Sequence, residues 1–161
     1  FIGIDTRLDA IYNTKDSDEL NEMRKKVWRR LYNCGLRYCF LGVETFNKSQ
    51  AFRYNKNLDL SNFEYAISFL KKLGINYTIG LILWDPSMKK QELMENLDFI
   101  KSNNLLGKTA SLLKVMRIQV NSGYLKKYCD FTPKGTSDFF NINDEFIEYK
   151  DFEIQKNISF I

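Results

Sequence analysis

The chain has 161 residues, of which 44% are hydrophobic and 15% aromatic, which is typical of one folded domain and excludes a disordered segment. Its 24 basic and 20 acidic residues give a net charge of +4, too small to indicate a nucleic-acid partner by itself. The absence of histidine excludes histidine-based catalytic triads and histidine-ligated metals. No apolar run is long enough to span a membrane, and we expect a cytoplasmic protein.

The first predicted strand covers residues 1–7 and ends in polar residues, of which Arg7 is the last. A helix should follow, because Asp16 and Glu19 have the spacing of a capping box and Gly35 stands where a left-handed helix end belongs. Apolar residues between these signals recur every three or four positions and predict one buried stripe: Leu20, Met23, Val27, Leu31 and Cys34. The opposite face, with Lys25, Lys26, Arg29 and Arg30 flanking Trp28, is either an RNA-binding patch or, as we favour, a solvated face.

The second predicted strand is the uncharged run 38–43, which ends at Glu44. A short run that is apolar at every position indicates a strand covered on both faces. Parallel strands of this kind present their functional groups at the carboxyl end. Glu44 is therefore a candidate site residue, although it could equally begin a solvated loop.

Two more helices and two more strands are expected. A capping-box spacing from Ser61 to Glu64 begins a helix that ends at Gly74, and its predicted buried stripe is Phe63, Ala66, Ile67 and Leu70. Strand 75–83 should stop before Pro86, since proline cannot donate to the ladder. The next helix should turn Leu93, Leu97 and Ile100 inward. The fourth strand, 112–120, alternates polar residues Arg117 and Gln119 with apolar ones and ends before Asn121.

The strand ends recur about every 40 residues, at Arg7, Glu44, Trp84 and Asn121, which predicts an α/β fold of parallel βα repeats. Four such units form half of a (β/α) barrel or a short doubly wound sheet. No glycine-rich dinucleotide turn follows any strand, so we favour the half barrel. We expect it to span residues 1–128, with an irregular C-terminal extension at 129–161. The extension, or a second copy in a dimer, should cover the exposed edge strands.

The order of several motifs resembles the radical SAM superfamily, over about residues 1–128. These motifs are Gly-Val-Glu at 42–44, Asn55-Lys56, the helix end Leu-Lys-Lys-Leu-Gly at 70–74 and Ile-Gly-Leu-Ile-Leu-Trp-Asp-Pro at 79–86. They are similar to the second half of that family's partial barrel, with cobalamin-type and coproporphyrinogen-dehydrogenase-type members most alike. The resemblance implies an enzyme that cleaves S-adenosylmethionine (SAM) at a [4Fe-4S] cluster to generate a 5′-deoxyadenosyl radical.

The resemblance also implies roles for individual residues. Glu44 matches a position that contacts the nucleoside of SAM, and Lys56 matches one that pairs with its carboxylate. Gly80 and Ile82 match a motif that lines the adenine, where the family usually has more glycine and a terminal acid in place of Trp84-Asp85. Arg7 is a further candidate SAM or substrate contact. From the last strand, three residues should look into the barrel: Arg117, Gln119 and Asn121.

The family's Cys-x₃-Cys-x₂-Cys loop is absent, and the three cysteines present (Cys34, Cys39, Cys129) cannot replace it. We therefore expect no metal ligand and no catalytic residue in this chain, which alone should be inactive. The chain begins on Phe1 without an initiator methionine, so we expect a piece of a longer parent whose upstream part holds the cluster and, in some members, cobalamin. The substrate is not revealed. The alternative is a non-catalytic βα domain that binds a ligand or a protein.

Overall fold

The computed structural model describes residues 1–56, 58–85 and 87–110, together with 118–119, 123, 127 and 139–140. These residues form two compact units. The first unit contains Phe1–Glu44, Leu58–Leu81 and Leu105–Ala110, and the second contains the described residues of the ranges 45–57, 82–104 and 111–161.

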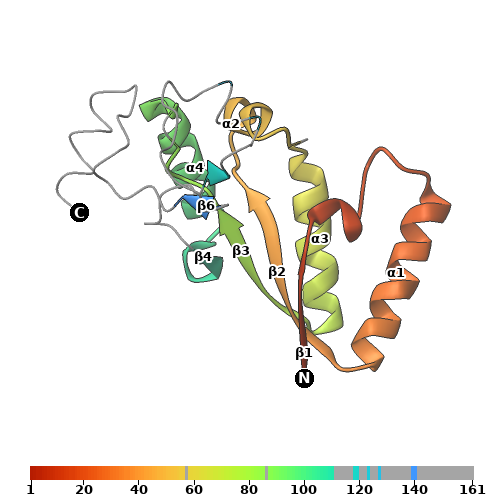
Figure 1. Cartoon of the computed structure of the whole chain (residues 1–161). Coiled ribbons are helices and arrows are strands. Elements are labelled where there is room, and N and C mark those ends of the chain that lie inside the picture. Colours follow the sequence, from red (N-terminus) through yellow and green to blue (C-terminus); the bar gives the residue numbers. More distant parts are fainter. Residues whose placement is uncertain are drawn as a thin grey trace. The chain divides into compact units, whose positions relative to one another are not determined.

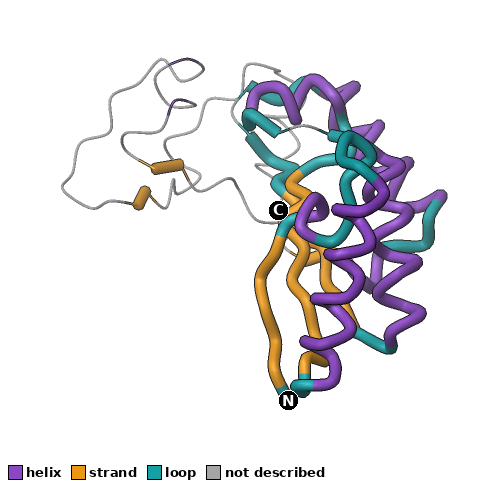
Figure 2. The backbone as a smooth tube through the Cα atoms, turned by 90° about the vertical axis from the view of Figure 1, so that its right-hand side faces the viewer, coloured by secondary structure: helices purple, strands orange, loops and turns teal. Residues whose placement is uncertain are grey.

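The first unit is a parallel sheet with helices, as the sequence predicts (Figure 1). Its strands follow the order β1-β2-β3-β4, and each neighbouring pair is parallel. Helices α1 and α3 lie in a layer beside the strands (Figure 2). The elements of this unit are β1 (Ile2–Thr6), η1 (Leu8–Ala10), α1 (Asp18–Asn33), β2 (Leu36–Glu44), α3 (Leu60–Leu73), β3 (Asn76–Leu81), η2 (Leu106–Lys108) and β4 (Thr109–Ala110).

The second unit contains α2 (Lys48–Arg53), α4 (Lys90–Ser102), β5 (Ile118–Gln119) and β6 (Phe139–Phe140). The short helix α2 was not predicted. The fourth parallel strand is β4, which precedes the predicted range 112–120. Of that range the structure describes residues 118–119, which form a strand as predicted but do not join the parallel sheet. Ile118–Gln119 pairs with Phe139–Phe140, and this pair is antiparallel. The predicted boundary between residues 128 and 129 lies outside the described residues.

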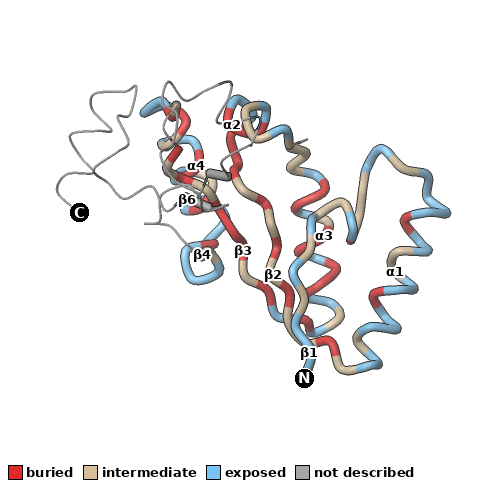
Figure 3. Tube along the Cα trace, in the orientation of Figure 1, coloured by how far each residue is buried: buried red, intermediate tan, exposed pale blue. Residues whose placement is uncertain are grey.

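Helix α3 buries the stripe that the sequence predicts. Phe63, Ala66, Ile67 and Leu70 are all buried, and Gly74 ends the helix with the expected left-handed φ of 73°. Alternate residues of β2 and β3 are buried as well, which places them in the same core (Figure 3). The core of the first unit therefore lies between α3 and one face of the sheet.

Helix α1 packs through a different face from the predicted one. Leu20, Met23, Val27 and Leu31 are exposed, as is Cys34, so the prediction that they form the buried stripe is wrong. The buried residues are Asn21 and Trp28 instead. The Trp28 indole donates a hydrogen bond of 3.0 Å to Ala10 O, and the Asn21 amide donates one of 2.9 Å to Asn13 O. Hydrogen bonds to the segment before the helix therefore decide which face is covered.

Both predicted helix starts are shifted. Ser17, not Asp16, caps α1, because Asp16 binds the Arg24 guanidinium. Asp59, not Ser61, caps α3, and its carboxylate accepts a hydrogen bond of 2.9 Å from Ser61 N.

Helix α4 buries Ile100 as predicted, but Leu97 is exposed, so that part of the prediction is wrong. The other buried residues of α4 are polar, namely Glu92 and Asn96.

No helix in the described part of the chain is long and apolar enough to cross a membrane. Among the described strands β1 pairs with β2 alone, and coverage of its outer edge by the tail or a second copy stays a prediction.

Candidate functional site

One face of the first unit's sheet carries small residues in register. Gly42 of β2 pairs with Gly80 of β3, and Gly80 pairs with Ala110 of β4. Side chains alternate along a strand, so Gly42 and Phe40 face away from the buried Leu41. At Gly42 and Gly80 this face of the sheet therefore has no side chain of its own, which leaves space above the backbone for neighbouring groups.

Glu44 ends β2 with an unusual backbone conformation. Its φ is 73°, in the left-handed region that residues other than glycine rarely adopt, and a register shift separates it from Gly42. Its Oε1 lies 3.0 Å from where a Cβ on Gly42 would stand. Gly42 thus leaves space for the Glu44 carboxylate, which folds back over the strand. Such strain costs about 1–3 kcal/mol and tends to occur at functional sites.

Gly80 leaves space for a neighbouring side chain in the same way. A Cβ at Gly80 would lie 2.4 Å from Phe40 Cζ and 2.6 Å from Phe40 Cε1. The sequence predicted that Gly80 admits an adenine, but the atoms that fill this space in the structure belong to Phe40. Sequence reasoning missed Phe40, because its proximity to Gly80 depends on the register between β2 and β3.

Arg7 lies directly after β1, where the sequence placed it. Its side chain is exposed, and the guanidinium donates hydrogen bonds of 3.1 and 2.7 Å to the Asp9 carboxylate. Asp5, which sequence reasoning did not select, is in register with Phe40 and is exposed. The structure therefore places a carboxylate on the Phe40 face of the sheet, on the strand next to β2.

The second unit contains a buried polar cluster around Asp85, whose side chain is fully buried (0% exposed). Asp85 Oδ2 accepts hydrogen bonds from Gln50 Nε2 (3.0 Å), Arg53 Nη2 (3.0 Å) and the Tyr54 hydroxyl (2.7 Å). Its Oδ1 accepts one of 2.9 Å from Ser87 N. Four donors thus compensate for the burial of this carboxylate.

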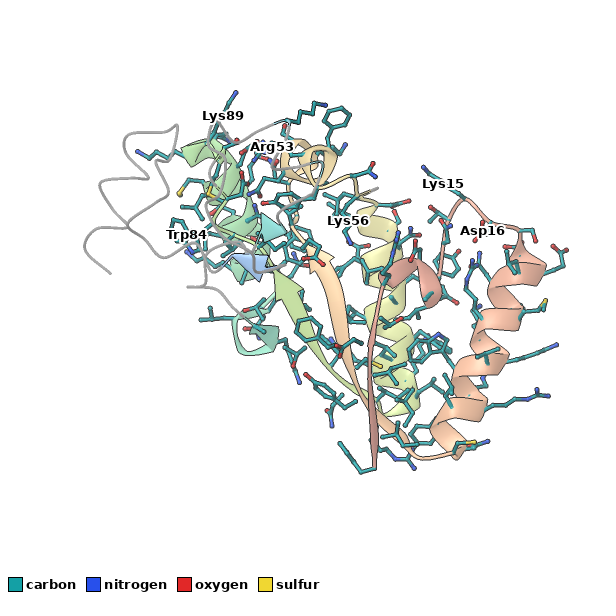
Figure 4. All side chains as sticks on the ribbon, in the orientation of Figure 1. Lys15, Asp16, Arg53, Lys56, Trp84 and Lys89 are labelled. Carbon is teal, nitrogen blue, oxygen red and sulfur yellow. The ribbon has the colours of Figure 1, made fainter. Side chains whose placement is uncertain are left out.

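Arg53, which is labelled in Figure 4, joins Asp85 to Glu92 in the first turn of α4. Its guanidinium binds Glu92 through two hydrogen bonds, of 2.6 and 2.7 Å, in addition to the bond with Asp85. Burial disfavours the charged guanidinium, but the hydrogen bonds and charges of Glu92 and Asp85 outweigh it and raise the pKa of Arg53 above its ordinary value. Arg53 is therefore charged at every pH at which the protein is folded.

A second set of hydrogen bonds extends the cluster to the start of the second unit. Gln50 Oε1 accepts from Thr45 Oγ1 (2.8 Å) and from Asn96 Nδ2 (2.6 Å). Asn96 Oδ1 accepts from the backbone N–H of Phe46 at 2.6 Å. Thr45, Gln50 and Asn96 are all fully buried. The cluster therefore ties residues 45–46, α2, the segment after β3 and α4 together.

Two of the remaining predicted site residues lie near this cluster. The others lie in β5 or outside the described residues. Lys56 is half-buried just beyond α2, and Ile82 follows β3 with its carbonyl oxygen 3.3 Å from the Tyr54 hydroxyl. Gln119 lies in β5, where only the backbone is described. Arg117 and Asn121 lie outside the described residues. The structure thus puts Arg7, Glu44 and Gly80 in the first unit and Lys56 and Ile82 in the second.

The described cysteines do not fit an iron–sulfur cluster. Cys34 is exposed and Cys39 is buried in β2, where burial raises the pKa of its thiol to about 11. Cluster ligands are thiolates, and burial disfavours the charged thiolate form of Cys39. Within the described part of the chain, no three Cys, Asp or Glu side chains are placed to hold a metal ion.

Comparisons with known proteins agree with the resemblance, although no family model matches the chain. It is 36% identical over 103 residues to 4′-phospho-dehydrooxetanocin synthase of Priestia megaterium and 33% identical over 89 residues to hopanoid C-3 methylase of Methylococcus capsulatus. These matches cover 63% and 55% of this chain, but only 14% and 15% of the relatives.

Solved structures give the same result. The cobalamin-dependent S-adenosylmethionine radical enzyme OxsB, with aqua-cobalamin bound, superposes with a TM-score of 0.68 at 26% identity. The match covers 77% of this chain and 22% of the OxsB chain. OxsB with both aqua-cobalamin and S-adenosylmethionine bound gives the same values. By sequence and by fold, the chain is therefore similar to part of a cobalamin-dependent S-adenosylmethionine radical enzyme, and it spans less than a quarter of the length of each of these proteins.

Proposed function

We propose that this chain supplies part of the SAM site of a cobalamin-dependent radical SAM enzyme whose [4Fe-4S] cluster is held by residues outside the chain. The observation that carries the proposal is the conformation of Glu44. A strained, left-handed glutamate ends a central parallel strand, and its carboxylate folds over a glycine. The relation to a SAM-dependent radical enzyme supports the same site.

The chemistry of the sheet face suits a nucleoside. A carboxylate can accept hydrogen bonds from both ribose hydroxyls, and the position of Glu44 at the end of β2 supports that role. The Phe40 ring beside Gly80 offers an apolar surface for the adenine. A [4Fe-4S] cluster held outside this chain would supply one electron to SAM, which would release methionine and give the 5′-deoxyadenosyl radical. The residues of this chain bind and orient SAM and take no part in electron transfer.

The second unit and the sheet edge supply further proposed contacts. Lys56 would pair with the SAM carboxylate, since a cation and a carboxylate form a charge-assisted hydrogen bond. Ile82 would line the adenine, and Arg7 would contact SAM or substrate. Arg117, Gln119 and Asn121 stay candidates for the barrel lining. The substrate and any cobalamin-binding segment are not assigned to residues of this chain.

The test uses the complete enzyme that contains this chain, with its cluster reconstituted, and measures 5′-deoxyadenosine formed from SAM. Glu44→Gln should raise the KM for SAM by about 10- to 100-fold, since a hydrogen bond to a charged group contributes about 1.5–3 kcal/mol. The matched control is Glu64→Gln, at an exposed position on α3, which should leave KM unchanged.

Two results would contradict the proposal. If the complete enzyme binds no SAM and forms no 5′-deoxyadenosine, the alternative of a non-catalytic βα binding domain holds. If Glu44→Gln and Glu64→Gln behave alike in an active enzyme, the enzyme class stands and the role of Glu44 fails.

A further inference from the structure

We propose that Asp85 is a positioning residue, which holds Lys56 and Ile82 in fixed places within the second unit. No residue of the polar cluster was selected from the sequence as a site residue. The identity of the ligand, SAM, rests on the proposed function. The hydrogen bonds that support the positioning role are all between residues of the protein.

The first step is the attachment of α2. Three side chains at its end, Gln50, Arg53 and Tyr54, all donate to the same oxygen of Asp85, at 2.7–3.0 Å. Asp85 in turn closes a turn in its own segment, with Ser87 N bonded to its Oδ1 and Met88 N bonded to its carbonyl oxygen at 3.0 Å. One buried carboxylate therefore fixes the end of a short helix to the segment that follows β3.

The second step connects α2 to Lys56. Lys56 N donates to Ala51 O at 2.8 Å, Asn55 N donates to Phe52 O at 3.1 Å, and Asn55 has a φ of 54°. This is the Schellman pattern of a helix end, with asparagine at the left-handed position. The backbone of Lys56 is thus fixed to α2, and any movement of α2 relative to Asp85 moves Lys56 with it.

The third step connects Ile82 to the same group. The Tyr54 hydroxyl, which donates to Asp85, has the carbonyl oxygen of Ile82 as a second acceptor within reach at 3.3 Å. Asp85 and Tyr54 therefore link the two segments that carry the second unit's proposed SAM contacts.

The charged nature of the cluster agrees with a positioning role. A buried ion pair adds little net stability compared with a packed apolar core, because removing the charges from water offsets most of their attraction. Its directional bonds instead select one geometry. Asp85 and Glu92 hold Arg53 from two sides, which restricts α2 to one orientation on α4.

The experiment uses Tyr54→Phe in the complete enzyme, because this change removes one hydroxyl and keeps the ring. Amide hydrogen exchange at Lys56 should become at least about 10-fold faster, while the amides of β2 and β3 keep their protection. The KM for SAM should rise by about 3- to 10-fold with kcat within twofold. Tyr32→Phe, on half-buried Tyr32 of α1, is the control and should change neither quantity.

A second pair of variants tests the connection to Lys56. Asp85→Asn should give a larger change than Tyr54→Phe in both measurements, and its control, Asp98→Asn on exposed Asp98, should give none. In a Lys56→Met background, Tyr54→Phe should raise the KM by a smaller factor, because Ile82 is then the only one of the two proposed SAM contacts that is still positioned.

The outcomes separate the two proposals. If Lys56 exchange is unchanged in Tyr54→Phe, the positioning role is overturned whatever happens to SAM binding. If exchange accelerates but Lys56→Met leaves the KM for SAM unchanged, positioning of the segment is supported and the SAM role of Lys56 fails. If Tyr54→Phe raises the KM equally with and without Lys56, Asp85 does not act through Lys56 and that part of the proposal is wrong.

Discussion

Helices α1 and α3 belong to the same unit and both connect parallel strands, but they bury different kinds of side chain. Helix α3 covers the sheet with an apolar stripe that includes Phe63 and Leu70, which are 3% and 0% exposed. Helix α1 has an apolar stripe at the same spacing, but Met23 and Val27 on it are 61% and 53% exposed. What α1 buries is Trp28 and Asn21, both of which hydrogen-bond to the segment that precedes it.

The difference shows that apolar spacing predicts a helix more reliably than it predicts the face that is covered. Helix α3 joins the two central strands, β2 and β3, and packs on the core between them. Helix α1 joins β2 to β1, which lies at the edge of the sheet. One flank of α1 meets α3, where Lys25 Nζ lies 5.1 Å from the Tyr65 ring. No such neighbour covers its apolar stripe among the described residues, so the stripe is exposed.

The largest expected effect is in the core beneath α3. Leu70→Ala should lower the free energy of unfolding by about 2–5 kcal/mol, because Leu70 is fully buried and the truncation leaves a cavity. Urea unfolding followed by circular dichroism would measure this. A loss below about 1 kcal/mol would mean that α3 does not form the core of this unit.

The parallel βα pattern and the candidate Glu44 could be predicted because they depend on local signals. An uncharged run that stops at a carboxylate is visible in the sequence, and so is the glycine that ends α3. The left-handed backbone of Glu44 is not visible, since residues other than glycine seldom adopt it. Helix α2 was missed because six residues are too few to show a period.

The Asp85 cluster could not be predicted for a different reason. Its hydrogen bonds join residues that are distant in the sequence, such as Gln50 with Asp85 and Thr45 with Asn96. Each of these polar residues, taken alone, is consistent with a solvated surface position. The only local signal was on α4, where Glu92 and Asn96 share the spacing of the buried Ile100.

A smaller effect is expected at the helix starts, where α1 and α3 should behave alike. Ser17→Ala and Asp59→Ala each remove a cap and should cost about 1 kcal/mol at neutral pH, despite the different burial of the two helices. The Asp59 effect should also depend on pH. The hydrogen bond from Thr14 lowers the pKa of Asp59 in the folded protein. Asp59 therefore contributes its full stabilisation above its pKa in the unfolded chain, and this stabilisation is lost as the pH falls through its pKa in the folded protein.

Chemical unfolding at neutral and acid pH would check both parts of this prediction. Asp59→Ala and the unchanged protein should converge in stability at acid pH, whereas the Ser17→Ala difference should stay constant, since serine does not titrate. If the stability difference caused by Ser17→Ala also disappeared at acid pH, general acid unfolding of the chain, and not protonation of the Asp59 cap, would explain why the variants converge.

The smallest effect is expected on the exposed stripe of α1. Val27→Ala should change the free energy of unfolding of this chain by less than about 0.5 kcal/mol, since the removed methyl groups are already in water. The same comparison in the proposed complete enzyme is informative, because a covered stripe would make the substitution cost about 1 kcal/mol or more. Equal and small effects in both proteins would show that α1 keeps a solvent-exposed apolar face throughout. A large effect in the 161-residue chain alone would instead indicate self-association through α1, which light scattering on Val27→Ala and the unchanged chain would detect.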